Sequence, residues 1–330
     1  MTASLPQLQS ALAEPIARFV AYKRGLGRSY DTEVAALRLL DRFLVERRVA
    51  HLEEVTDDLI EAFMASRPRS RPRSYNHLLC TVRRLFEWLV QQEELERSPV
   101  RIGPRRVTGQ RRPFIFDQMA ATRLLNLALE LPDNPRAVMR GATYHALFAI
   151  LYGLGLRVGE ACRLQRDDLD LARRLLVIRK SKFYKSRLVP FGPRMATLLG
   201  AYADGGVPPL ANPSGASPLF SFTARRPIHP CTASQTFHAL VPRLGLAVPP
   251  GCSPPRLHDL RHSFAVGTLL RWYRSGVDPG AGLLHLATFM GHVDVNSTAV
   301  YLQITDALLR EANRRFEAFA QPVLGEGLPS

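Results

Sequence analysis

The chain has 330 residues, of which 46% are hydrophobic and 22% are charged. At roughly 150 residues per domain this length predicts two domains, and the composition excludes an intrinsically disordered chain. The charge is unusual, because 44 Lys and Arg against 29 Asp and Glu give a net charge of +15. A surplus of this size attracts polyanions, so nucleic acid is the first partner to consider and an anionic membrane the second.

Three further features argue against a membrane, export or a metal. The longest apolar run, residues 141–156, contains His145 and is shorter than the ~20 residues that cross a bilayer, so it predicts a buried helix. The first residues lack the basic and apolar regions of a secretory signal. The four cysteines lie far apart without a CxxC pair, which argues against both disulfides and a zinc site. We therefore expect a reducing cytoplasm, no metal and no other cofactor.

Residues 1–100 predict a small bundle of four amphipathic helices, because apolar side chains recur at helical spacing and strand alternation is absent. The first helix is expected at residues 8–24, ending at a glycine pair. The second follows Ser29 as its cap, and Thr56 opens the third. The fourth is expected at residues 74–94.

Two arginine-rich stretches flank the fourth expected helix. The first is residues 67–73, where prolines forbid a continuous helix, and the second, residues 101–112, is interpreted as the linker between two domains. A run of charge is often only a solvated face, but two such runs in a chain of this net charge favour phosphate contacts. The candidate nucleic-acid-binding residues are Arg67, Arg69, Arg71, Arg73, Arg105, Arg106, Arg111 and Arg112.

Residues 113–330 predict a second, mostly helical domain with one β-hairpin. Residues 175–178 and 188–191 are short apolar runs on either side of a basic turn. Helices are expected at residues 193–202, 231–244, 258–274 and 283–290, and a terminal amphipathic helix at 306–320. The predicted fold class is thus mainly α with a small β-sheet (α+β).

Lysine is rare in this chain. Of the 44 basic residues 40 are Arg, and three of the four Lys lie in the hairpin turn, at Lys180, Lys182 and Lys185. An ammonium group can release a proton, whereas a guanidinium cannot at any ordinary pH. The cluster therefore indicates either proton transfer or plain phosphate contact.

Four separated segments gather cationic and hydrogen-bonding side chains. They are G-L-R-V-G-E with Arg157 and Glu160, the hairpin with Lys182 before R-L-V-P, H-D-L-R-H with His258 and Arg261 on one helix face, and G-H at His292 with Tyr301 nine residues later. In this order they resemble the tyrosine recombinase (phage integrase) family over residues 114–320. The first hundred residues resemble the helical core-DNA-binding domain of that family. Residues 270–282 are similar in length to those of members carried by transposable elements.

The resemblance implies a site-specific recombinase that cuts and rejoins DNA through a 3′-phosphotyrosine intermediate, without metal or ATP. Such cleavage needs a nucleophile, stabilisation of charge on the phosphate and a proton for the leaving oxygen. The implied roles are Tyr301 as nucleophile, Arg157 and Arg261 as phosphate clamps, Lys182 as general acid, His258 as phosphate ligand and proton-transfer partner of Tyr301, His292 as phosphate donor, and Glu160 as orienting group. Phe183 and Tyr184 occupy a turn in which the family often has a small residue, so Lys180 and Lys185 stay open as alternatives to Lys182.

Two other functions stay open at this point. A catalytically silent, sequence-specific DNA-binding protein would have the same basic surface, and a type IB topoisomerase would use a similar Tyr, Arg and Lys set to relax DNA. The resemblance also implies a homotetramer on two double-stranded DNA sites, with a monomer or weak association in the free state and no membrane. The terminal helix packs either on its own domain or on a neighbouring protomer. We expect the protein in the bacterial cytoplasm, associated with the nucleoid.

Overall fold

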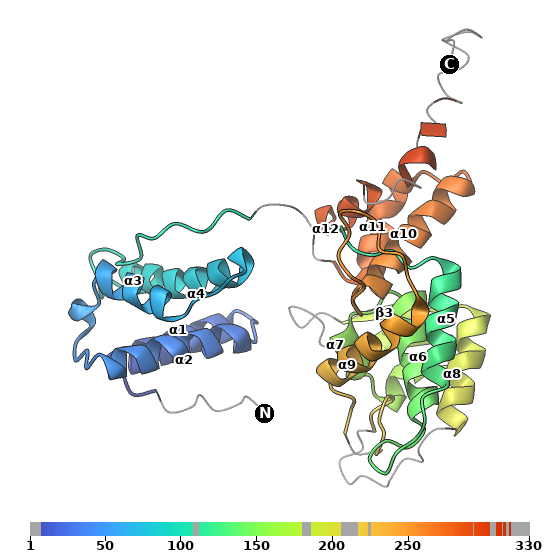
Figure 1. Ribbon diagram of the computed structural model, residues 1–330, viewed down its shortest axis with the longest axis horizontal. Coiled ribbons are helices and arrows are strands. Elements are labelled where there is room, and N and C mark those ends of the chain that lie inside the picture. Colours follow the sequence, from blue (N-terminus) through green and yellow to red (C-terminus); the bar gives the residue numbers. More distant parts are fainter. Residues whose placement is uncertain are drawn as a thin grey trace. The chain divides into compact units, whose positions relative to one another are not determined.

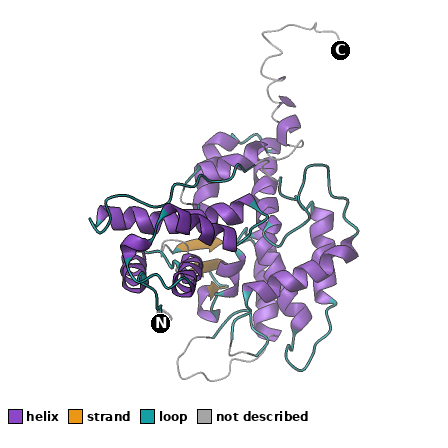
Figure 2. Cartoon of the chain, turned by 60° about the vertical axis from the view of Figure 1, so that its left-hand side comes forward, coloured by secondary structure: helices purple, strands orange, loops and turns teal. Residues whose placement is uncertain are grey.

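The computed structural model describes residues 8–107, 112–179, 186–205, 217–223, 226–292, 294–303, 308–311, 313–314 and 317. The chain divides into two compact units, Met1–Gln110 and Arg111–Ser330. Each unit has its own apolar core. Helices dominate both, and the strands are few and short (Figures 1 and 2). The mainly α class with a small β-sheet is thereby confirmed.

In the first unit, residues 8–107 form four helices and one 3₁₀ turn, in agreement with the expected helical bundle. They are α1 (Ala13–Gly25), α2 (Asp31–Glu46), η1 (Leu52–Glu54), α3 (Asp57–Ser66) and α4 (Pro72–Gln91). The apolar side chains of α4 pack against those of the other helices, and Phe19, Phe43 and Phe63 lie fully inside this core. Burial of such aromatic and aliphatic side chains stabilises the bundle.

The helix ends of the first unit test the expected caps. Thr56 caps α3 as predicted, because its side chain accepts a hydrogen bond from the N–H of Leu59 at 3.3 Å. The expected Ser29 cap is wrong. The N-cap of α2 is Tyr30, with a left-handed backbone at φ 58° and no side-chain cap bond. Helix α1 begins later than residue 8 because the preceding turn is tied to Asp41, which accepts hydrogen bonds from the N–H and Oγ of Ser10 at 2.9 and 2.6 Å.

The second unit contains the remaining helices and the sheet. Its helices are α5 (Gln118–Leu129), α6 (Arg140–Gly153), α7 (Val158–Cys162), η2 (Arg166–Asp168), α8 (Pro193–Gly205), α9 (Pro230–Leu240), η4 (Val241–Leu244), α10 (Asp259–Arg274), α11 (Pro279–Met290), α12 (Asn296–Ala299) and η5 (Val300–Gln303). Helix α6 is the buried helix predicted from the apolar run. The single helix expected at 231–244 instead changes to a 3₁₀ turn at Val241, because Pro242 cannot donate an α-helical hydrogen bond. Most of the expected helix 306–320 lies outside the described residues.

The sheet has three antiparallel strands in the order β1 (Leu169–Asp170), β2 (Leu175–Ile178) and β3 (Arg187–Pro190). The hairpin β2–β3 was expected, with Leu176 opposite Val189 and Ile178 opposite Arg187. The basic turn that joins the two strands, residues 180–185, lies outside the described residues. The two-residue strand β1 is too short to produce a sequence pattern.

Two apolar clusters stabilise the second unit. One gathers α5, α6, α9 and the sheet, and the other lies between α10, α11 and η5 and includes Tyr301. Helix α10 contacts α6, α11 and η5, so it connects the two clusters. This packing brings four segments together: the start of α7, strand β3, the start of α10 and the end of α11. No helix in the described part of the chain has the length and apolarity of a membrane span.

Candidate active site

Arg157 is the N-cap residue of α7 and follows a turn that requires glycine. Gly155 has a φ of 61°, and a Cβ at this position would lie 2.3 Å from the ring of Phe264. The backbone N–H and the Nη1 of Arg157 donate to the carboxylate of Glu160 at 3.0 and 2.7 Å. Glu160 therefore fixes both the start of α7 and the direction of the Arg157 guanidinium.

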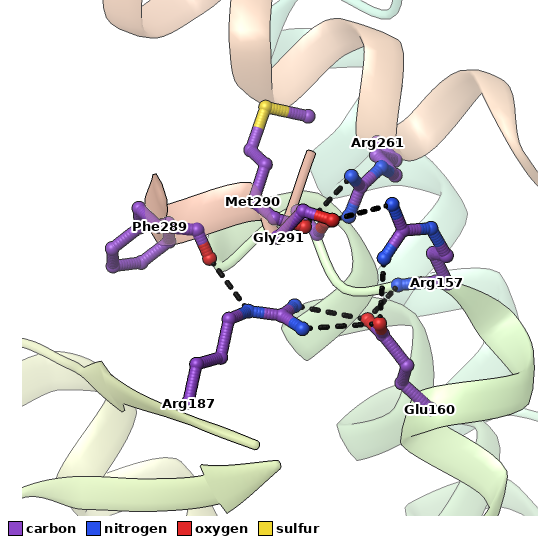
Figure 3. Close-up of polar contacts among 8 residues, drawn as sticks. Arg157, Glu160, Arg187, Arg261, Phe289, Met290 and Gly291 are labelled. Carbon is purple, nitrogen blue, oxygen red and sulfur yellow. Dashed lines mark hydrogen bonds and ion pairs between the residues drawn. The ribbon is translucent and has the colours of Figure 1, made fainter. Parts of the chain in front are cut away.

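The carboxylate of Glu160 also accepts hydrogen bonds from Arg187 on β3. The Nη1 and Nη2 of Arg187 lie 3.0 and 2.9 Å from the two carboxylate oxygens, in a bidentate pair. The side chain of Glu160 is 2% exposed and that of Arg187 is 11% exposed, so this pair is shielded from water. One buried carboxylate thus joins α7 to the hairpin (Figure 3).

Three consecutive carbonyl groups at the end of α11 each accept a hydrogen bond from a different arginine. The carbonyl of Phe289 accepts from the Nε of Arg187 at 2.8 Å. The carbonyls that follow, those of Met290 and Gly291, accept from Arg261 at 2.9 Å and from Arg157 at 2.8 Å (Figure 3). The last carbonyls of a helix have no partner within the helix and carry its negative dipole end, so they suit cations. This helix end holds the three guanidinium groups beside one another.

The three arginines differ in how many donors the protein occupies. Each guanidinium has five N–H donors. Within the described residues, the contacts to protein use two donor atoms of Arg157 and two of Arg261, whereas Arg187 uses its Nε and both Nη atoms. Arg157 and Arg261 therefore keep capacity to bind an anion, while Arg187 is committed to Glu160 and Phe289.

Arg261 is the most deeply buried cation of the site, with 2% of its surface exposed. Burial and, after it, the positive charge of Arg157 lower its pKa to about 10, against the opposite effect of Glu160. The guanidinium stays protonated at neutral pH. A like-charged pair with one deeply buried and one half-buried arginine favours an anion that binds between its members.

Three histidines surround this pair. The pKa values of His258 and His292 are lowered to about 4 and that of His262 to about 3, in each case first by burial and then by neighbouring positive charge. His258 precedes α10 and keeps an exposed face, whereas His262 and His292 are half-buried. The Nδ1 of His292 lies 2.6 Å from the hydroxyl of Thr298. All three imidazoles are neutral at pH 7.

Tyr301 lies in η5 with 4% of its surface exposed. Its Oη is 2.9 Å from the Nδ1 of His262 in α10. Burial raises its pKa, and the charges of Arg261 and Arg157 lower it. The ring of His292 stacks on that of Tyr301 with 6.3 Å between the ring centroids. The structure thus brings Tyr301 together with the histidines and the arginine pair.

Two contacts of the site were not expected from sequence. The first is Arg187, which the sequence marks only as the R of R-L-V-P at the exit of the hairpin. The second is His262. The sequence feature that could have indicated its role is its position four residues after His258, which predicts the same helix face. In both cases the partner comes from a distant segment, so no spacing in the sequence reveals the contact.

The candidate residues on the hairpin turn are not placed. Lys180, Lys182 and Lys185 lie outside the described residues, so the position of the expected general acid stays a prediction. Within the described residues, no group of three His, Cys, Asp or Glu side chains is arranged to hold a metal ion.

The arginine-rich stretches of the first unit are partly used inside that unit. The guanidinium of Arg105 lies 3.9 Å from the ring centroid of Tyr75 and donates to the carbonyl of Arg69 at 2.8 Å. The Nη1 of Arg69 donates to Ser74 at 3.0 Å. Arg67 is half-buried, Arg111 lies outside the described residues, and the exposed members of the set are Arg71, Arg73, Arg105, Arg106 and Arg112.

Comparison with known proteins adds independent findings. Residues 122–307 match the phage integrase family. The chain is 32% identical over 313 residues to the protein y4rB of Sinorhizobium fredii. This alignment covers 93% of this chain and 98% of that protein. It is 28% identical over 254 residues to the tyrosine recombinase XerA of Thermococcus kodakarensis, covering 77% of this chain and 78% of the relative.

Solved structures with a similar fold include two integrases. The Tn1549 transposon integrase in complex with a circular intermediate DNA is similar with a TM-score of 0.64 and 18% identity, over 93% of this chain and 100% of that one. A lambda integrase dimer bound to a COC′ core site is similar with a TM-score of 0.59 and 18% identity, over 88% and 76% of the two chains. At these identities the likeness concerns the fold.

Proposed function

The chain belongs to the phage integrase family and is a tyrosine-type site-specific recombinase that acts on double-stranded DNA, and on this premise we propose the role of each residue. Neither a silent DNA-binding protein nor a type IB topoisomerase is favoured by any contact of the site. The observation that carries the proposal is the pair Arg157 and Arg261, held on consecutive carbonyls close to the histidines and Tyr301.

In the proposed reaction, Tyr301 attacks the scissile phosphate and forms a 3′-phosphotyrosine while a 5′-hydroxyl leaves. Arg157 and Arg261 bind the non-bridging oxygens, because each keeps donors that no described residue occupies and planar guanidinium forks match phosphate oxygens. The exposed His258 and the half-buried His292 donate to the same phosphate. The phosphotyrosine keeps the energy of the broken bond, so rejoining needs neither ATP nor a metal.

The leaving 5′ oxygen needs a proton, and we propose that Lys182 supplies it. Support comes from the scarcity of lysine in this chain and its concentration in the hairpin turn. Strand β3 of the hairpin is tied to Arg157 through Arg187 and Glu160, which supports a role of the hairpin in the chemistry at the phosphate.

Recombination joins two duplexes, so we propose that four copies assemble on two DNA sites at the nucleoid, from copies that are monomeric or weakly associated without DNA. The domain boundaries proposed for this assembly are residues 1–100 for the core-DNA-binding domain, 101–112 for the linker and 113–330 for the catalytic domain. Sedimentation of the chain with and without its DNA site tests the assembly. A complex that never exceeds one copy per site would contradict it.

A nicked suicide substrate tests the chemistry directly. The full chain is mixed with a nicked duplex that carries the ends of the element surrounding its gene, and the mixture is denatured. We expect a covalent protein–DNA adduct that survives denaturation and is absent with Tyr301→Phe. Tyr184→Phe, on the hairpin turn, serves as the tyrosine control and should leave the adduct. An adduct that persists in Tyr301→Phe would exclude Tyr301 as the nucleophile.

A further inference from the structure

The hydroxyl of Tyr301 has a specific partner that the reaction described above does not use. The Nδ1 of His262 lies 2.9 Å from Oη, and the two ring centroids are 5.5 Å apart at an angle of 55°. Within the part of the chain that the structure describes, His262 is the side chain hydrogen-bonded to this hydroxyl. It follows Arg261 in α10 and is half-buried.

The other two histidines are less well placed to serve the hydroxyl. The Nδ1 of His292 is engaged with Thr298 at 2.6 Å, and its ring meets Tyr301 face to face at an angle of 19°. The ring of His258 is edge-on to His262 with 4.8 Å between centroids, and it keeps an exposed face toward solvent. These arrangements leave the His262 nitrogen as the one directed at Oη.

The charge state and the tautomer of His262 together decide the direction of this hydrogen bond. The pKa of His262 is lowered to about 3, first by burial and then by its neighbours His258, Arg256, Arg261 and His292, which face it from α10, from the segment before it and from the segment after α11. The imidazole is therefore neutral at pH 7, with one N–H and one lone pair. Burial raises the pKa of Tyr301, so the phenol keeps its proton. In the tautomer that carries its proton on Nε2, the lone pair lies on Nδ1 and the phenol donates to it.

From this geometry we propose that His262 is the proton acceptor of Tyr301 during DNA cleavage, a role that rests on Tyr301 being the nucleophile. As the bond between Oη and phosphorus forms and the bond from phosphorus to the 5′ oxygen breaks, the hydroxyl proton moves to Nδ1 of His262. The 5′ oxygen receives its proton from the general acid. In rejoining, the 5′-hydroxyl attacks, and His262 returns the proton to the departing phenolate.

Binding of DNA improves His262 as a base. After burial, His258 and Arg256 lower the pKa of His262 most, followed by Arg261, and Arg261 is the cation among them that the bound phosphate neutralises. The imidazole is thus a weak base in the free protein and a stronger one when the scissile phosphate is in place. This order of events restricts activation of the nucleophile to the DNA complex.

The experiment compares single-turnover rates of adduct formation on the nicked duplex between pH 6 and 9. His262→Asn keeps a hydrogen-bond acceptor close to the position of Nδ1 but cannot take a proton. We expect it to be slower by about 10²-fold at pH 7 and to gain rate roughly tenfold per pH unit as the phenol ionises without help. A fluorinated, more acidic tyrosine at position 301 should accelerate His262→Asn more than the unaltered chain.

Two further substitutions separate this role from a structural one. His258→Asn, at the N-cap of α10, should lower the rate by the same factor at every pH. His238→Asn on the exposed side of α9 should leave rate and pH profile unchanged. A His262→Asn chain with the wild-type rate, or with a constant loss at every pH and no response to the fluorinated tyrosine, would overturn the proposal.

A second measurement applies even if His262→Asn fails to fold. Nitrogen NMR of histidine-labelled full-length protein identifies the tautomer of His262, assigned by its response to Tyr301→Phe. We expect the proton on Nε2, and a proton on Nδ1 would contradict the proposal. Failure of the recombinase chemistry itself is distinguishable, since the unaltered chain would then form no Tyr301-dependent adduct at any pH.

Discussion

At the scale of single residues, Glu160 is a buried carboxylate that forms ion pairs with two arginines. Its carboxylate is 2% exposed and lies between the guanidinium groups of Arg157 and Arg187. Removing one partner of a buried ion pair leaves uncompensated charge, which typically costs 3–5 kcal/mol. Here two cations would face each other without the anion that separates them.

Glu160→Gln should therefore lower the free energy of unfolding of the second unit by about 3 kcal/mol. Each unit contains one of the two tryptophans, so denaturant unfolding followed by Trp272 fluorescence in a Trp88→Phe background reports on the second unit alone. Glu130→Gln is the matched control, because its ion pair with Arg243 is 59% and 52% exposed and contributes little. Equal effects of the two substitutions would show that Glu160 has no special role.

Gly291 combines two constraints at the end of α11. Its φ is 70°, and a Cβ would lie 2.6 Å from the Nη1 of Arg187. Gly276, at the end of α10, has a φ of 81° but has no atom within 4 Å of the added Cβ among the described residues. The two positions separate backbone strain from the displacement of Arg187.

We expect Gly276→Ala to cost about 1–2 kcal/mol for the left-handed backbone. Gly291→Ala should cost roughly 2 kcal/mol more, because Arg187 must leave a buried hydrogen-bonded pair. The same Trp272 unfolding assay measures both. Gly291→Ala should also slow adduct formation by at least about tenfold through the shifted Arg157 contact, and equal costs at the two glycines would show that Arg187 adapts freely.

At the scale of elements, the hairpin connects the anchored Arg187 to the lysine-containing turn. The leaving oxygen needs a proton only because an alkoxide is a poor leaving group. A substrate with a sulfur in place of that 5′ oxygen needs no general acid. Its cleavage thus distinguishes loss of the acid from loss of phosphate binding.

Lys182→Ala should slow cleavage of normal DNA by about 10²-fold or more. The same variant should cleave the sulfur-containing substrate at close to the wild-type rate. Lys185→Ala should cleave both at rates near wild type and serves as the control on the same turn. If Lys185→Ala shows the rescue instead, Lys185 is the general acid. A defect of Lys182→Ala that sulfur does not relieve would indicate a role in phosphate binding.

Most helices and the hairpin could be predicted, because long amphipathic or fully apolar segments carry their periodicity in the sequence. Features set by tertiary contacts could not. The start of α1 depends on Asp41, the strand β1 is two residues long, and the break after α9 comes from Pro242. The contacts of Arg187 and His262 could not be predicted for the same reason, since they form only when β3 meets α11 and η5 meets the start of α10.

At the scale of the whole molecule, the charge of +15 is unevenly distributed. Residues 66–112 hold 12 Arg against four Glu, which gives +8 of it. Part of this charge is used inside the first unit, where Arg105 stacks on Tyr75 and bonds to Arg69. Arg71, Arg73 and Arg106 are exposed, so they are the residues best placed to meet a DNA backbone.

Each phosphate contact releases counterions, so the logarithm of DNA affinity falls with the logarithm of salt concentration by about 0.9 per contact. Replacing Arg71, Arg73 and Arg106 together by Gln should reduce this slope by up to about 3. The matched control replaces three exposed arginines that are paired with acids, Arg18, Arg173 and Arg243, and removes the same three charges from the +15. Fluorescence anisotropy of labelled duplex DNA over a salt series measures both slopes. A control slope that falls as far as that of the first triple would mean that the net charge, rather than a defined surface, attracts the DNA.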